Sequence, residues 1–226
     1  MITYHPDLIQ GSEEWLAARC GLLTASEMRL ILTPAKLKMA DNGEMRGHLH
    51  ELLSQRITRH VEPAYVGYDM LRGQEEEVLA RYTYSEKYAE VAEVGFVTND
   101  EFGFTLGYSP DGLVGDDGLI ECKSRRQKFQ IEVIIEQAVP VEFMLQLQTG
   151  LLVTRRKWID FVSYSGGLPM VTIRVYPVPE IQAAIVEAAT EFEARIRAKM
   201  DAYAAALISG ARLIPTERTV QQEMYT

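Results

Sequence analysis

Strand-type segments are confined to the middle of the chain, with helical segments before and after them. Residues 90–98, 104–108, 118–123, 157–164 and 170–176 alternate in polarity or are rich in β-branched and aromatic residues, as strands are. Capping residues and amphipathic spacing predict helices over residues 12–21, 24–33, 45–59, 71–84, 141–153 and 179–210. This order predicts an α/β (α+β) fold in which a central mixed β-sheet is flanked by helices.

A single domain accounts for the whole length. The 226 residues suffice for one well-filled core and do not require a second. Hydrophobic residues make up 47% and charged residues 24%, as in soluble globular proteins. We expect one domain over residues 1–226, with a helical part over about 1–88, a sheet-containing core over about 89–178 and a closing helix over about 179–210. Residues 35–44 are interpreted as a surface loop.

Hydropathy and cysteine content indicate a cytoplasmic protein. The sequence has no run of about 18 apolar residues that could span a membrane, and residues 1–7 lack the basic and apolar regions of a signal peptide. Cys20 and Cys122 lie far apart and without metal-ligand spacing. They are interpreted as free thiols in a reducing compartment, and we expect no membrane partner.

The charge of the chain argues against a protein that simply coats nucleic acid. Its formal net charge is −9, whereas such proteins carry a basic excess. An enzyme that holds divalent cations fits this charge, because its site must be acidic and the cation then faces the phosphate. Basic residues gather over 123–128 and 155–157, and each stretch is either a local phosphate track or a solvated loop.

Asp111, Glu121 and Lys123 form the most informative pattern in the sequence. Glu121 and Lys123 stand two residues apart in an apolar strand, so their side chains share one face while Cys122 points to the other. A hairpin turn at residues 116–118 folds Asp111 back beside Glu121. Two carboxylates and an ammonium group are therefore predicted to converge on one point.

This group of side chains suits hydrolysis of a phosphodiester. Mg²⁺, with Mn²⁺ as a substitute, prefers oxygen ligands such as the carboxylates of Asp111 and Glu121, and the carbonyl of Cys122 is expected to complete the coordination. Lys123 is expected to orient or deprotonate the attacking water and to offset charge on phosphorus. A bare D-x9-E-x-K pattern is weak evidence, since strand edges often carry Glu and Lys on a solvated face. The apolar neighbours of Glu121 favour a site.

Four motifs follow one another along most of the chain. They are W-x3-R-x-G-x2-T-A-S-E over residues 15–27, G-x3-E-x2-A over 73–80, S-P-D-G with E-C-K over 109–123, and Q-x-Q over 146–148. Together they resemble the motifs of the lambda-type phage exonucleases, also called viral recombinase or alkaline exonucleases, which belong to the RecB-like nucleases. The resemblance implies a restriction-endonuclease-like PD-(D/E)xK core.

The resemblance also implies which residues carry out the chemistry. Glu77 matches a helix glutamate that approaches the metal, which leaves Glu75 and Glu76 as surface charges. Gln146 matches a glutamine that lines the active site and orients water or the scissile phosphate; a satisfied core amide is the alternative. The catalytic residues implied are Asp111, Glu121, Lys123, Glu77 and Gln146, and the metal ligands implied are Asp111, Glu121, Cys122 and Glu77.

Three further residues fall where the family binds the 5′-phosphate of DNA, namely Arg19, Ser26 and Ser109. A guanidinium fork, hydroxyl groups and helix N-terminal donors suit a terminal phosphate dianion. The alternatives are that Arg19 only pairs with a nearby glutamate and that Ser26 only caps a helix.

Apolar residues near the N-terminus of the Glu77 helix are a second point of similarity. Met70 and Leu71 stand where the family carries an apolar wedge that splits terminal base pairs, with ordinary core packing as the alternative. Trp15 is interpreted as a core anchor and not as a residue that stacks on bases.

The activity implied by the resemblance is a Mg²⁺-dependent 5′→3′ exonuclease that acts on double-stranded DNA. Such an enzyme binds a 5′-phosphorylated end, releases mononucleotides and leaves a 3′ single strand. The family implies a homotrimeric ring around the duplex and a single-strand annealing protein as the partner in recombination. A closed ring would keep an acidic protein on DNA by topology.

Two other functions remain open at this point. An endonuclease of the same PD-(D/E)xK class would cut closed circular DNA, whereas an exonuclease needs an end. A DNA-end-binding module whose nuclease activity has decayed is the second alternative, and the intact Asp111, Glu121 and Lys123 argue against it. An iron–sulfur exonuclease is excluded, because two cysteines cannot supply a four-cysteine cluster.

Overall fold

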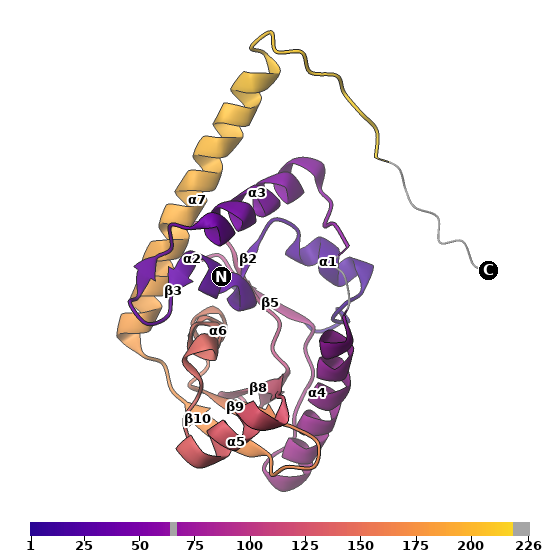
Figure 1. The fold of residues 1–226 in the computed structure, drawn as a ribbon, viewed down its shortest axis with the longest axis vertical. Coiled ribbons are helices and arrows are strands. Elements are labelled where there is room, and N and C mark those ends of the chain that lie inside the picture. Colours follow the sequence, from indigo (N-terminus) through magenta and orange to yellow (C-terminus); the bar gives the residue numbers. More distant parts are fainter. Residues whose placement is uncertain (64–66, 219–226) are drawn as a thin grey trace, which may run out of the picture.

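The computed structural model describes residues 1–63 and 67–218, and residues 64–66 and 219–226 lie outside its described part. Helices surround two four-stranded sheets, and a third sheet has two short strands (Figure 1). The helices are α1 (Glu13–Arg19), the 3₁₀ helix η1 (Ala25–Glu27), α2 (Met28–Ile31), α3 (Gly43–Thr58), α4 (Tyr68–Lys87), α5 (Gln127–Glu136), α6 (Val141–Thr154) and α7 (Pro179–Leu207). The strands are β1 (Ile2–His5), β2 (Leu23–Thr24), β3 (Leu32–Thr33), β4 (Lys38–Met39), β5 (Phe96–Asn99), β6 (Leu106–Tyr108), β7 (Gly112–Val114), β8 (Gly118–Ser124), β9 (Trp158–Tyr164) and β10 (Val171–Val175).

Two four-stranded sheets form the centre of the fold, in place of the single sheet expected. One has the strand order β1-β5-β6-β2 and the other β10-β9-β8-β7. Both are mixed, because β2 is parallel to β6 and β8 is parallel to β9, while the other neighbours are antiparallel. The chain crosses from one sheet to the other between β6 and β7. The expected mixed α/β architecture is confirmed, and Asp111 lies at the crossing.

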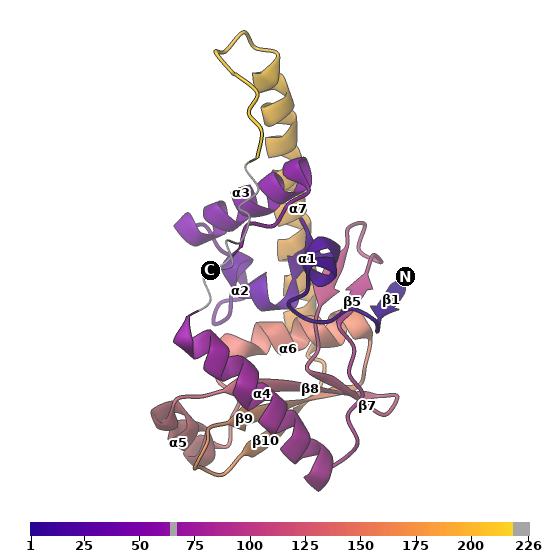
Figure 2. The same cartoon turned by 90° about the vertical axis from the view of Figure 1, so that its right-hand side faces the viewer.

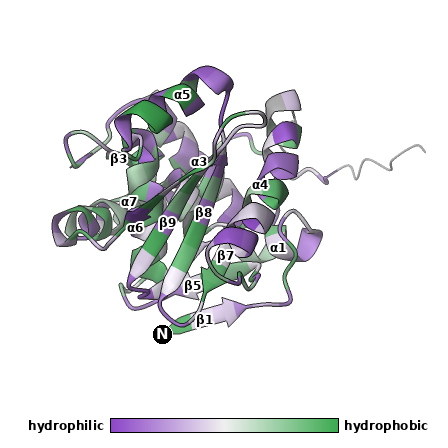
Figure 3. Cartoon of the chain, turned by 90° about the horizontal axis from the view of Figure 1, so that it is seen from below, coloured by the Kyte–Doolittle hydropathy of each residue, from purple (hydrophilic) through white to green (hydrophobic). Residues whose placement is uncertain are grey.

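Strand β8 separates two apolar clusters. Leu119 belongs to the larger cluster, which includes residues of α6 and α7. Ile120 and Cys122 belong to the smaller one, which includes Ala80 and Tyr84 of α4. Helix α6 therefore lies against one face of this sheet and α4 against the other (Figure 2), and hydrophobic residues run along β8 and β9 between them (Figure 3). With both faces covered, a charged side chain on β8 is buried and has to be paired.

Helix α5 was not expected from the sequence. Its buried positions are Gln130 and Val133, while Phe129 and Ile131 are largely exposed, so it has no apolar stripe. The amide of Gln130 instead donates to the carbonyls of Ser163 and Pro169. A polar residue at the packed position removes the periodic signal on which helix prediction depends.

Five strands of two to four residues were not predicted, because they are too short for a periodic pattern. They are β1, β2, β7 and the hairpin β3–β4, and β4 lies in the segment interpreted as a loop. Of the strand expected over residues 90–98, only the end forms β5, and Ala92 adds one isolated bridge to Leu113.

Helix α7 closes the fold and is held to α3 by an ion pair. Its C-terminal end runs past α3 and projects beyond the rest of the described chain (Figure 1). Arg56 donates from Nη1 and Nη2 to Glu193, at 2.8 and 2.6 Å, and from Nε to the carbonyl of Gly21 at 2.8 Å. Within the described ranges no helix, α7 included, has the length and apolar character needed to cross a membrane.

Arg56→Ala is expected to lower the free energy of unfolding by about 3 kcal/mol, since it leaves a buried carboxylate without its partner. Urea unfolding followed by circular dichroism measures the change. Arg195→Ala is the control. Arg195 lies on α7, two residues after Glu193, and forms an exposed ion pair with Glu191, so its loss is expected to cost about 0.4 kcal/mol. Similar losses in the two variants would contradict this account.

Candidate active site

The β7–β8 hairpin and the crossing before it bring the two predicted acids together. Gly112 pairs with Ile120 in the hairpin, so Asp111 lies beside Glu121 and Cys122. Asp111 Oδ2 accepts a hydrogen bond from the backbone N–H of Cys122 at 2.5 Å. This contact fixes the first acid against the strand that carries the second.

Glu121 lies at the centre of the site, and both of its carboxylate oxygens accept hydrogen bonds. Oε1 accepts from Lys123 Nζ at 2.6 Å and from Gln146 Nε2 at 2.5 Å. Oε2 accepts from Tyr108 Oη at 2.7 Å. Glu121 is only 1% exposed, and these hydrogen bonds from β6, β8 and α6 offset the free-energy cost of burying its charge.

Cys122 faces away from this group, as the alternation of the strand predicted. Its side chain packs with Ala80 and Tyr84 under α4, and burial raises the pKa of its thiol. The thiol therefore takes no part in the site, whereas the backbone of Cys122 contacts Asp111.

Helix α4 adds a third acid. Arg81 of the same helix links Glu77 to Asp111, because its Nη1 lies 3.9 Å from a carboxylate oxygen of Glu77 and donates to the carbonyl of Asp111 at 3.2 Å. Burial raises the pKa of Asp111, and the charges of Glu121 and Glu77 raise it further. Burial likewise raises the pKa of Glu77, with a further contribution from Glu121. The site thus carries more negative charge than its basic residues balance.

Lys123 is the ammonium group predicted beside these acids. Burial by itself would lower the pKa of Lys123, but the carboxylates of Glu121 and Asp111 outweigh it and the pKa is raised. Its Nζ also lies 5.8 Å from the centre of the Phe143 ring. In this geometry Lys123 is a charged hydrogen-bond donor.

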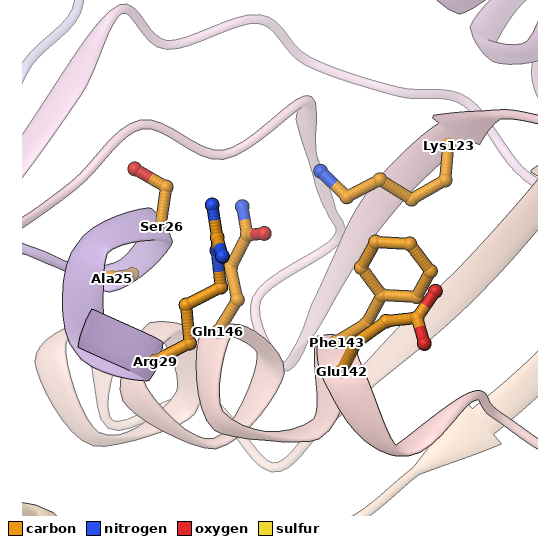
Figure 4. A pocket seen from close by; sticks show the side chains of 7 residues that line it. All are labelled: Ala25, Ser26, Arg29, Lys123, Glu142, Phe143 and Gln146. Carbon is orange, nitrogen blue, oxygen red and sulfur yellow. The ribbon is translucent and has the colours of Figure 1, made fainter. Parts of the chain in front are cut away.

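A cleft of about 500 Å³ opens beside Lys123. Figure 4 shows the ammonium group of Lys123 and the amide of Gln146 pointing into the same space, with Ser26 of η1 and Arg29 of α2 on the opposite side. Arg29 is exposed on the rim and was not singled out from the sequence. The cleft therefore joins the acidic group to the first sequence motif.

Thr24 and Trp15 link the residues predicted to bind a 5′-phosphate. The hydroxyl of Thr24 accepts from Arg19 Nη2 at 3.2 Å and lies 3.3 Å from Ser26 Oγ. Trp15 Nε1 donates to Ser109 Oγ at 2.9 Å, and the guanidinium carbon of Arg19 lies 4.2 Å from the centre of the Trp15 ring. Trp15, interpreted as a core anchor, is partly exposed and belongs to this group.

The alternatives for these residues were that Arg19 pairs with a nearby glutamate and that Ser26 caps a helix. The first of these is present in the structure, and the second is not. Arg19 Nη2 lies 3.8 Å from Glu27, and burial lowers the pKa of Arg19 although the charge of Glu27 raises it. The cap of η1 is made by Thr24, whose N–H and hydroxyl donate to Glu27 at 3.0 and 2.7 Å. Ser26 is exposed, so its hydroxyl faces solvent.

Met70 and Leu71 are exposed at the start of α4, by 50% and 49%. Ordinary core packing, the alternative to a wedge, therefore does not describe them in this chain. Their role as a wedge stays a prediction.

Glu76 was interpreted from the sequence as a surface charge, and the structure corrects this interpretation. Glu76 accepts hydrogen bonds from Ser124 Oγ and from the backbone N–H of Gly166, and its side chain is 17% exposed. Glu76 therefore ties α4 to the end of β8 and to the β9–β10 turn. Glu75 is exposed, as expected.

The two basic stretches have different surroundings. In 123–128, Arg125 is buried, with its guanidinium 5.0 Å from each of two phenylalanine rings and bonded to a glutamate of α6. In 155–157, Arg156 donates to two carbonyls of the β7–β8 turn, both at 2.7 Å. Arg125 therefore packs between α5 and α6, and Arg156 holds the β7–β8 turn. Neither a phosphate track nor a solvated loop describes these two residues.

The donor chemistry of the site fits a hard divalent cation. Asp111, Glu121, Cys122 and Glu77, the predicted ligands, do not form a ready-made set, since no three His, Cys, Asp or Glu side chains within 1–63 and 67–218 are arranged to hold a metal. Mg²⁺ commonly takes only one or two carboxylates and keeps several waters. Two carboxylates and a surplus of negative charge meet that need.

Comparisons with known proteins place the chain in a family. The model of the YqaJ-like viral recombinase domain matches residues 14–157, more than half of the chain. One similar solved structure is that of LHK-Exo, an alkaline exonuclease from Laribacter hongkongensis, in complex with dAMP. Its sequence is 33% identical, the match covers 88% of this chain and 98% of LHK-Exo, and the TM-score is 0.77. A second LHK-Exo structure is 35% identical, with 87% and 100% covered and a TM-score of 0.72.

A phage related exonuclease from Haemophilus somnus 129PT shares the fold, with 15% identity, 79% and 96% of the two chains covered and a TM-score of 0.56. No curated protein matches the chain. The chain belongs to the family of YqaJ-like viral recombinase domains, as its four motifs indicated, and it has the fold of an alkaline exonuclease.

Proposed function

We propose that this protein is a Mg²⁺-dependent 5′→3′ exonuclease. It degrades the 5′-phosphorylated strand of double-stranded DNA to mononucleotides and leaves a 3′ single strand for annealing-type recombination. The observation that carries the proposal is the convergence of Asp111, Glu121, Lys123 and Gln146, of which Lys123 and Gln146 line a cleft whose other side presents Ser26. LHK-Exo has been solved with dAMP, a nucleoside monophosphate of the kind that such a reaction releases.

Asp111 and Glu121 are proposed to hold the cation, with Glu77 approaching from α4. When bound, Mg²⁺ supplies positive charge for the attacking and leaving oxygens of the phosphodiester. Gln146 orients the attacking water or the scissile phosphate through its amide. Lys123 orients or deprotonates the attacking water, and it donates to a phosphate oxygen and offsets its charge.

The DNA end is proposed to meet the first motif and the start of α4. Arg19, Ser26 and Ser109 bind the 5′-phosphate, and Thr24 holds Arg19 and Ser26 at hydrogen-bonding distance. A guanidinium group and hydroxyls suit a phosphate dianion. The exposed apolar side chains at the start of α4 serve as the wedge between terminal base pairs.

The proposed assembly is a homotrimeric ring, and the proposed partner is a single-strand annealing protein that takes up the exposed 3′ strand. A ring retains DNA by enclosing it, which agrees with a net charge of −9. A chain of this charge would otherwise be repelled by the phosphate backbone.

A linear duplex with phosphate on only one 5′ end tests this function. In Mg²⁺, we expect the phosphorylated strand to become mononucleotides at least about 10-fold faster than the other strand, and closed circular duplex to stay intact. The solution mass of the protein tests the trimer. Cleavage of the circle would indicate an endonuclease, and end binding without cleavage would indicate a decayed module.

A further inference from the structure

Tyr108 contacts Glu121, the central carboxylate of the proposed site. Its Oη donates to Glu121 Oε2 at 2.7 Å, and the two residues are each 1% exposed. No role for Tyr108 was expected from the sequence. A hydrogen bond between two groups so deeply buried is strong and fixes the direction of both.

Both the backbone and the ring of Tyr108 are held in place. Tyr108 ends β6, where its backbone pairs with Val97 of β5. Helix α6 passes over the ring at Gly150, where an added Cβ would lie 2.8 Å from two atoms of the ring. The helix backbone thus approaches the ring more closely than any side chain would permit, and the phenol has a fixed position.

The two oxygens of Glu121 consequently have partners of different kinds. Oε2 is bonded to the buried phenol, which cannot leave. Oε1 is bonded to Lys123 and Gln146, and both of these side chains line the cleft (Figure 4). Side chains that border a cleft can exchange a partner for water or substrate. Oε1 is therefore the oxygen available to a ligand.

We propose that Tyr108 is a positioning residue that keeps Glu121 Oε1 directed into the cleft, so that this oxygen meets the divalent cation. The inference rests on the proposed function, because it takes Glu121 as a ligand. Tyr108 acts only through Glu121 and touches neither cation nor substrate. Partners of this kind commonly contribute 10- to 100-fold to metal affinity or activity.

Tyr108→Phe tests the proposal, since it removes the hydroxyl and keeps the ring against Gly150. Binding of Mn²⁺ to the protein without DNA, followed by the electron paramagnetic resonance of free Mn²⁺, is expected to weaken by about 10-fold. The kcat for nucleotide release is expected to fall by about 10- to 100-fold, and the KM for DNA ends to change by less than about 2-fold.

Tyr84→Phe is the matched control. Tyr84 is also 1% exposed and donates to a buried carboxylate, that of Asp160, at 2.7 Å, but this carboxylate is paired with Arg174 and not with residues that line the cleft. The same deletion there is expected to leave Mn²⁺ binding and kcat at the values of the parent.

Mn²⁺ binding at the parent's strength by folded Tyr108→Phe would overturn the proposal, as would an equal loss in Tyr84→Phe. If Tyr108→Phe loses the circular dichroism spectrum of the parent, 3-fluorotyrosine at position 108 gives a second measurement in a nearly unchanged protein. Its ¹⁹F resonance is expected to shift during a titration with Mg²⁺, and a resonance that stays in place would also overturn the proposal. A parent whose Mn²⁺ binding is weakened by Tyr108→Phe but which releases no nucleotide would contradict the proposed function and leave this inference standing.

Discussion

Asp111→Asn is expected to lower the rate of nucleotide release by on the order of 10³-fold and to leave the chain folded. Asparagine keeps an oxygen that can accept from the Cys122 N–H, so the hairpin is preserved. It removes a negative charge that the cation needs. Release of labelled mononucleotides from a linear duplex in Mg²⁺ measures the loss.

The same substitution is expected to raise the free energy of unfolding. Burial and the charges of Glu121 and Glu77 raise the pKa of Asp111 in the folded chain. A carboxyl group whose pKa is higher in the folded than in the unfolded state opposes folding at neutral pH; this penalty shrinks as the pH falls below the folded pKa and disappears below the unfolded pKa. A neutral side chain removes it at any pH. Thermal unfolding at neutral pH measures the gain, which would separate a functional residue from a structural one.

Asp117→Asn is the matched control for Asp111→Asn. Asp117 lies on the turn of the same hairpin and pairs with the exposed Lys157 at 2.8 Å. We expect parent-like nuclease rates and a change in stability below about 0.5 kcal/mol. Rates within a few-fold of the parent for Asp111→Asn would remove the proposed site, and an equal loss for Asp117→Asn would point to hairpin geometry instead of charge.

The convergence of Asp111, Glu121 and Lys123 could be predicted because it depends on local rules. The period of two in a strand decides which side chains share a face, and a short hairpin decides which residues lie opposite each other. The structure has Glu121 bonded to Lys123, Asp111 beside both, and Cys122 turned away. The long helices α3, α6 and α7 were predictable for the same reason, since each has caps or an apolar face of its own.

Tyr108 and Trp15 could not be found in this way, because their roles come from contacts between different elements of the fold. Trp15 bonds to Ser109 over 94 positions, and Tyr108 reaches Glu121 from a different sheet. No periodicity carries such contacts. Thr24 gave a signal, the capping-box spacing, but that spacing predicts a helix start whether or not the hydroxyl also holds Arg19.

Arg19→Ala is expected to reduce the preference for 5′-phosphorylated over 5′-hydroxyl ends by about 10- to 100-fold, the value of hydrogen bonds between charged groups. The guanidinium group lies over the Trp15 ring and donates from Nη2 to Thr24, and its other N–H donors can meet an anion. Rates on two linear duplexes that differ only in the 5′ group measure the preference. Arg19→Lys is expected to restore it in part, because an ammonium group retains the charge and loses the fork.

Arg29→Ala is the control for Arg19→Ala, because Arg29 is exposed on the rim of the cleft beside Ser26. We expect it to slow both substrates equally, since an exposed cation attracts the whole DNA backbone and not one terminal group. Loss of the phosphate preference in Arg29→Ala but not in Arg19→Ala would place the phosphate at the cleft rim. The stack of Arg19 on Trp15 and its bond to Thr24 would then serve the fold alone.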